Sequence, residues 1–127
     1  MPFDNDPTIL DDEGLLRRIP HYQWVEDGAG GWRPSSAAFG DLELSVDLAS
    51  TLAALNEPMT APLRGHDGYA LVSLKAGSAR QNNQAVCRDP LDSNPAHAIV
   101  YGKKTNAIKK QLARQSEWII SPSDLSK

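Results

Sequence analysis

The clearest periodic pattern in the chain lies between residues 42 and 48. Leucine or valine occupies every second position of this stretch, at Leu42, Leu44, Val46 and Leu48. Successive side chains of a strand point to opposite faces of a sheet, so this alternation predicts a strand with one buried face. Leucines then recur at the spacing of one helical face, Leu48, Leu52 and Leu55. We therefore expect a strand to about residue 46 and a helix from 48 to 56.

Other stretches also have the composition of strands. Residues 15–19 form a short extended piece, because Pro20 disfavours helix at the residue before it. Residues 69–74 are apolar on both faces, which predicts a buried central strand. Residues 84–87 and 97–101 are two further short strands, the second ended by Gly102.

A glycine-rich turn follows an aromatic stretch near the start of the chain. Residues 21–26 continue the first strand as a second extended piece. Residues 27–31 then contain three glycines, which adopt positive φ without steric cost. We expect a hairpin that closes on Trp32 and Arg33.

The helices are few and unevenly placed. A brief helical turn is predicted at 76–81, and a longer helix from 105 to about 117 with Ile108 and Leu112 on one stripe. Residues 118–120 either end that helix or form a last strand. Strands and helices do not alternate regularly, which predicts the α+β class. We expect a single domain with a mostly antiparallel, curved sheet and two or three helices, including a C-terminal amphipathic helix.

The length and composition fit one ordinary domain. The chain has 127 residues, of which 40% are hydrophobic and 23% charged, so it can bury a core without disulfides. We divide it into an acidic, loosely ordered lead (1–14), one α+β domain (15–120) and a flexible tail (121–127).

The net charge of −3 conceals an asymmetry between the two ends. Residues 1–14 hold five acids and no base, whereas residues 102–127 hold six bases and two acids. The two ends can pair with each other within the chain. Alternatively, the basic end faces an anionic ligand.

The cysteine and histidine contents argue against several classes of protein. The single cysteine, Cys87, rules out an internal disulfide and indicates a reducing, cytoplasmic setting. Apolar runs are too short to span a membrane. The three histidines, His21, His66 and His97, are widely spaced and show no metal-ligand motif. We therefore predict neither a metal site nor a cofactor.

The strongest candidate for an anion site is the corner between the 97–101 strand and the following helix. Lys103, Lys104 and Thr105 stand there after Gly102. A phosphate-binding loop needs a second glycine where this chain has His97, so an NTPase is not predicted. Cations at a helix N-terminus oppose the helix dipole by roughly 0.3–1 kcal/mol each, which an anion would offset. The alternative is that these lysines are solvated or pair with acids of the chain.

His97 is the candidate catalytic residue, as a general acid or base at a strand end. The alternative is a packed histidine with one hydrogen bond. A straight strand would separate His97 from Lys103 by roughly 20 Å, which argues against one compact site that contains both.

A second polar cluster is formed by Arg33, Ser35 and Ser36, which can hold a phosphate or carboxylate. Pro-Ser-Ser is equally typical of a hydroxyl-stabilised turn. Arg17 and Arg18 on an early strand, with Ser35 and Ser36 later, resemble the arginine and Ser/Thr positions of ADP-ribosyltransferase folds. The match covers four residues without a Glu-X-Glu or Gln-X-Glu element, and implies NAD as a ligand to test.

Two functions of different classes follow from these features. The first is a small soluble intracellular binding domain that uses its charged surface, including the basic C-terminal helix, to bind a protein partner. The second is a small enzyme or effector that acts on a phosphate-bearing ligand: a nucleotide, NAD or RNA. In the second, His97 is the acid or base and the two polar clusters hold the ligand.

Overall fold

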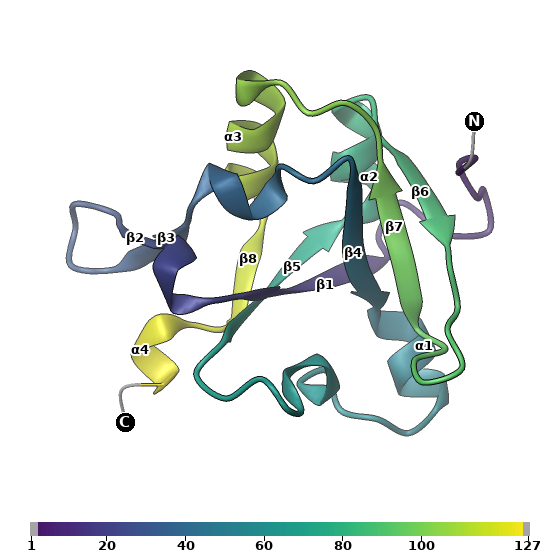
Figure 1. The fold of residues 1–127 in the computed structure, drawn as a ribbon, viewed down its shortest axis with the longest axis horizontal. Coiled ribbons are helices and arrows are strands. Elements are labelled where there is room, and N and C mark those ends of the chain that lie inside the picture. The colour runs from purple at the N-terminus through teal and green to yellow at the C-terminus, as the bar shows by residue number, and fades with distance from the viewer. Residues whose placement is uncertain (1–2, 126–127) are drawn as a thin grey trace.

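The main element of this computed structural model, which describes residues 3–125, is a six-stranded sheet in the order β6-β7-β4-β1-β5-β8 (Figure 1). All of its paired strands are antiparallel. The strands are β1 (Gly14–Ile19), β4 (Glu43–Leu48), β5 (Ala70–Lys75), β6 (Ala85–Arg88), β7 (His97–Tyr101) and β8 (Glu117–Ile120). A second sheet pairs β2 (Trp24–Glu26) with β3 (Trp32–Pro34). The predicted α+β class with an antiparallel sheet is confirmed.

The helices within residues 3–125 are all short. They are α1 (Ala49–Ala54), α2 (Ala76–Gln81), α3 (Asn106–Gln115) and α4 (Pro122–Leu125), with single turns η1 (His21–Gln23), η2 (Ser36–Phe39) and η3 (Ala61–Leu63). Two or three helices were expected, and the fourth, α4, lies in the segment that was predicted as a tail. The predicted amphipathic helix corresponds to α3, which buries Leu112 and exposes Lys110.

The sheet is covered on both faces, which explains why β5 is apolar on both of its sides. One core cluster includes Val72 of β5 together with residues of α2, η2 and α3. Leu71, the preceding residue, belongs to a second cluster with Leu52 of α1, against which η3 residues pack. Consecutive side chains of β5 thus enter different cores, and the prediction of a buried central strand is confirmed.

The alternation in residues 42–48 is only partly obeyed. Leu44 and Val46 are buried and Ser45 is exposed, as predicted. Leu42, however, is 52% exposed, because β4 begins one residue later. The carbonyl oxygen of Leu42 accepts hydrogen bonds from Gly102 N and Lys104 Nζ, so backbone contacts and not side-chain burial fix this residue. Asp47 is buried despite its charge.

The pairing of β1 with its two neighbours is very unequal. Its register with β5 runs along the whole strand, from Gly14 opposite Lys75 to Ile19 opposite Ala70. Its register with β4 is limited to Leu15 and Leu16. Figure 1 shows β1 crossing steeply away from β4. A notch therefore opens in the sheet beyond Leu16.

The stretch at 21–26 was expected to be one strand, and this is wrong for its first half. Pro20 holds an extended conformation, and its carbonyl accepts from Gln23 N at 2.9 Å, which forms the single turn η1 before β2 begins. The predicted hairpin is confirmed, since β2 pairs with β3 around 27–31. Asp27 accepts from two backbone N–H groups of that turn, which lowers the pKa of its carboxyl group.

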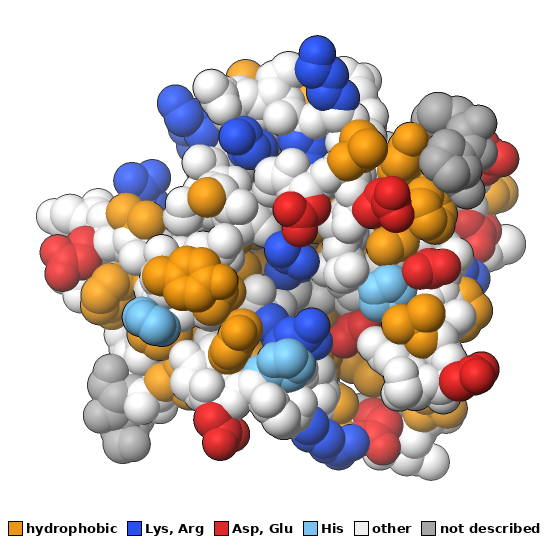
Figure 2. All heavy atoms as spheres, viewed as in Figure 1, with side chains coloured by type: hydrophobic (Ala, Val, Ile, Leu, Met, Phe, Trp, Pro, Cys, Tyr) orange, Lys and Arg blue, Asp and Glu red, His pale blue; other side chains and the backbone are white. Residues whose placement is uncertain are grey.

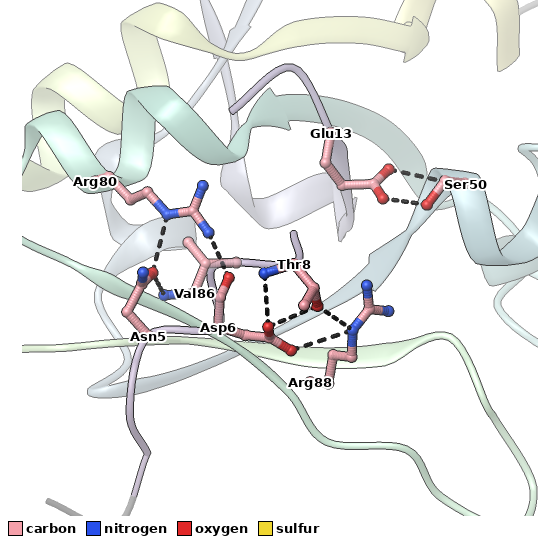
Figure 3. A network of polar contacts seen from close by, with 8 residues as sticks. All are labelled: Asn5, Asp6, Thr8, Glu13, Ser50, Arg80, Val86 and Arg88. Atoms are coloured by element: carbon pink, nitrogen blue, oxygen red, sulfur yellow. Dashed lines mark hydrogen bonds and ion pairs between the residues drawn. The ribbon is translucent and has the colours of Figure 1, made fainter. Parts of the chain in front are cut away.

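The acidic lead is in contact with α2 and β6 (Figure 3). Arg80 donates to Asn5 Oδ1 and to Asp6 O at 2.9 and 2.8 Å, and Asp6 forms a salt bridge with Arg88 at 3.2 Å. Ile9 is 1% exposed and belongs to the core. Two of the five acids of the lead, Asp6 and Asp11, are thus paired with Arg88 of β6 and Arg80 of α2. The loose order of this lead stays a prediction.

The segment predicted as a tail, 121–127, begins with α4, and its last two residues lie outside the described residues. Its flexibility stays a prediction. Among the described residues, no helix is both long and apolar enough to cross a membrane.

Candidate functional site

A cavity of about 780 Å³ lies between the β2–β3 hairpin and α3, and we call it the tryptophan cavity. Trp32 and Trp118 form part of its wall, and Arg33, Ser35 and Ser36 line it. The structure thus brings the second predicted cluster together in one concave site. From α3, the cavity also receives Lys110 and Arg114, and these were missed by sequence reasoning.

Hydrogen bonds hold the walls of the tryptophan cavity in place. Trp118 Nε1 donates to Trp32 O at 2.9 Å, which ties β8 to the hairpin. Ser35 N donates to Gln23 O at 2.8 Å, and the Ser35 hydroxyl accepts from Ala37 N at 3.1 Å. The hydroxyl-stabilised turn predicted as an alternative is therefore present. The Ser35 hydroxyl proton is still free to bond a ligand.

The charge of the tryptophan cavity is mainly positive. Lys110 and Arg114 are four residues apart on α3 and so share one helix face. Neither they nor Arg33 forms a salt bridge within residues 3–125, although Asp27 interacts electrostatically with Arg33. Glu117 is the one acid on the lining. Exposed cations beside apolar walls suit an anion that carries a flat apolar part.

The lysine corner, Lys103 to Thr105, lines neither of the two cavities described here. Thr105 caps α3, since its hydroxyl accepts from Ile108 N at 3.2 Å. Lys104 Nζ donates to the carbonyls of Leu42, Val100 and Gly102 at 3.2, 3.0 and 2.9 Å. Burial lowers the pKa of Lys104 to about 8. Lys104 thus faces the end of β7, and Lys103 is the exposed lysine of the corner.

A second cavity of about 590 Å³ occupies the notch between β1 and β4, and we call it the histidine cavity. His66 and His97 line it together with Arg17, Arg18 and Asp47. In Figure 2, blue and pale blue side chains lie around the centre of this face, over β1 and the lower part of β4, with red side chains among them. The lining is mainly polar, so this cavity differs in kind from the first.

His97 is fixed within the histidine cavity by a carboxylate. Its Nδ1 lies 3.1 Å from Asp89 Oδ2 and 3.0 Å from Asp89 O. Asp47 of the adjacent strand β4 lies opposite His97 in the sheet. The Oδ1 atom of Asp47 accepts a hydrogen bond from Asn94 Nδ2 at 2.7 Å. Asp89 is therefore the carboxylate that holds the imidazole, while Asp47 is its neighbour in the sheet, and sequence spacing gives no signal for the Asp89 contact.

Two consecutive arginines reach the notch from β1. Arg17 bridges it, with Nε donating to Ala38 O at 2.7 Å and Nη1 to Ser45 O at 2.9 Å. Its burial lowers its pKa, but the group stays charged at neutral pH. Arg18 Nη1 donates to Pro62 O at 3.2 Å. Arg17 is thus a structural bridge, while Arg18 keeps donors for a ligand.

The predicted site residues fall into three separate places. Arg33, Ser35 and Ser36 line the tryptophan cavity, His97 lines the histidine cavity, and the lysine corner is apart from both. Among the described residues, no group of three or more His, Cys, Asp or Glu side chains could hold a metal ion. Comparison with known proteins found no matching family model, curated protein or solved structure.

Proposed function

We propose that this protein is a binding domain whose tryptophan cavity holds a phosphate-bearing ligand with a flat apolar part, as in a nucleotide or NAD. One observation carries the proposal: Arg33, Lys110 and Arg114 meet at a cavity walled by two tryptophans, and none of them forms a salt bridge within residues 3–125. Guanidinium and hydroxyl donors suit phosphate oxygens, and indole rings suit a base.

Tryptophan fluorescence and calorimetric titration test this proposal with ATP, NAD, pyrophosphate and inorganic phosphate. We expect ATP or NAD to bind more tightly than inorganic phosphate, because only they can also contact the tryptophans. The double variant Lys110→Glu/Arg114→Glu should weaken binding at least about tenfold, since hydrogen bonds to charged groups contribute roughly 1.5–3 kcal/mol each.

The matched control is Lys75→Glu/Lys103→Glu, which makes the same change in net charge at two exposed positions outside both cavities. Binding that survives the control and fails in Lys110→Glu/Arg114→Glu supports the tryptophan cavity. Loss in the control alone would move the anion site to the lysine corner. No signal with any of the four compounds would contradict a phosphate ligand.

A protein partner is the second candidate, because the same basic face of α3 suits an acidic segment. An acidic peptide that binds when nucleotides do not, and that loses binding in Lys110→Glu/Arg114→Glu, would favour it. A reducing cytoplasmic setting is part of both proposals. It is supported by Cys87, which is a buried free cysteine.

A further inference from the structure

The histidine cavity contains an imidazole in the orientation that a general base requires. Both atoms that contact His97 Nδ1 belong to Asp89, and both are acceptors, a carboxylate oxygen and a carbonyl oxygen. The Nδ1 atom must therefore carry the proton, which leaves the lone pair on Nε2. An imidazole held by a carboxylate, with its other nitrogen free, activates hydroxyl nucleophiles in many enzymes.

Three other groups complete the chemistry of this cavity. His66 lines it from the loop before β5, with its ring 5.2 Å from that of Tyr69. Arg18 forms no salt bridge within residues 3–125, and its contact with Pro62 O occupies only Nη1. Tyr22 also lines the cavity and is 75% exposed, so its ring is open to stacking.

From this set of groups, we infer that the histidine cavity is a catalytic site that cleaves single-stranded RNA by acid–base catalysis. His97 is the base, His66 the acid and Arg18 the cation that holds the phosphodiester. Asp89 is a positioning residue that acts through His97. This site is separate from the tryptophan cavity and does not depend on the function proposed for it.

The reaction is a transesterification within the RNA. His97 Nε2 takes the proton of a ribose 2′-hydroxyl, and that oxygen forms a bond to the adjacent phosphorus. The bond from phosphorus to the 5′-oxygen of the next nucleotide breaks. Protonated His66 gives its proton to that leaving oxygen. The products are a cyclic 2′,3′-phosphate and a free 5′-hydroxyl, and a proton exchange with water returns both histidines to their starting states.

RNA fits these groups better than DNA or a peptide. Its own 2′-hydroxyl supplies the nucleophile beside the phosphate, so two imidazoles and one guanidinium are a sufficient set. DNA lacks that hydroxyl. A peptide would need an oxyanion site, whereas Arg18 on the cavity lining is suited to a phosphate.

The test incubates the full chain with a short fluorescent single-stranded RNA and with the same sequence as DNA and as 2′-O-methyl RNA. We expect cleavage of the RNA alone, with a cyclic phosphate on the product. His97→Gln and His66→Gln should each lower the rate roughly 100-fold or more, as is typical for loss of a general acid or base. Lys75→Glu, at an exposed position outside the cavity, should cleave like the wild type.

The role of Asp89 has its own readout. Asp89→Asn should lower kcat about tenfold with little change in KM, and ¹⁵N spectra of the imidazole should show the Nδ1 proton of the wild type partly moved to Nε2. Cleavage that persists in His97→Gln, cleavage of the 2′-O-methyl RNA, or no cleavage by a wild type with a native circular dichroism spectrum would each overturn the proposal.

Discussion

Both cavities contain arginine side chains, but the two differ in how their charged groups are bonded to the fold. In the tryptophan cavity, the cations are at the surface and form no salt bridge within residues 3–125, while the walls are apolar rings. In the histidine cavity, Arg17, Asp47 and His97 are all hydrogen-bonded to the fold around them. The first is therefore suited to attract a ligand, and the second to orient groups. Substitutions in the histidine cavity should accordingly cost more stability.

The largest effect is expected at Arg17, which bridges the notch between β1 and β4. Arg17→Met keeps the aliphatic stem but leaves Ala38 O and Ser45 O without their donor. We expect the free energy of unfolding to fall by about 1–3 kcal/mol, because the partly buried carbonyl of Ala38 is left unpaired, whereas water can reach the exposed carbonyl of Ser45. Urea denaturation measures this. Arg18→Met is the matched control, with a loss below about 1 kcal/mol, and equal losses would contradict the bridging role.

Lys104, in the lysine corner, gives a pH-dependent effect, because burial lowers its pKa while Asp41 and Arg17 act on its charge. Its pKa is lowered to about 8 by burial from an ordinary value of 10.5. Between these values the unfolded chain keeps the proton and the folded chain does not, so this group makes stability rise with pH in that window. Half-burial and solvent screening limit the gain to about 1–2 kcal/mol.

Urea denaturation at several pH values between 7 and 10.5 checks the Lys104 prediction. Lys104→Arg is the control, because a guanidinium stays charged across this range. The wild type should gain stability relative to this variant as the pH rises. A constant difference between the two proteins would contradict the lowered pKa.

A smaller effect is expected from the hydrogen bond that closes the tryptophan cavity. Trp118→Phe keeps most of the ring but removes the Nε1 donor to Trp32 O. We expect a loss of about 1 kcal/mol in unfolding free energy, the usual net value of one such bond. Thermal unfolding followed by circular dichroism measures it. A loss as large as that of Arg17→Met would remove the contrast between the two cavities.

The smallest effect is expected for the cations of the tryptophan cavity. Lys110→Ala/Arg114→Ala should change the unfolding free energy by no more than about 0.5 kcal/mol, because both side chains are exposed and form no salt bridge within residues 3–125. Ligand affinity should fall all the same. Destabilisation well above that value would show that these cations hold the fold together.

Much of the fold could be predicted from local patterns. The strand predicted at 69–74, the hairpin around 27–31 and the amphipathic helix from 105 to about 117 follow from apolar runs, glycines and helical spacing. The structure confirms them as β5, the β2–β3 pair and α3. The errors lie at the ends of the predicted strands. Pro20 turns the chain into η1, and Leu42 is exposed just before β4, although its carbonyl oxygen accepts from Gly102 N and Lys104 Nζ.

The candidate sites divide in the same way between sequence and tertiary structure. Local clusters of residue types can be seen in the sequence: Arg33 with two serines, two lysines at a helix start, and a histidine at a strand end. The packing of the folded chain is needed to bring Lys110 and Arg114 of α3 to the first cluster and Asp89 to His97. The reason is physical, since these contacts join residues from different elements. Their distances depend on how β1 and β4 diverge and where α3 packs, which no local spacing encodes.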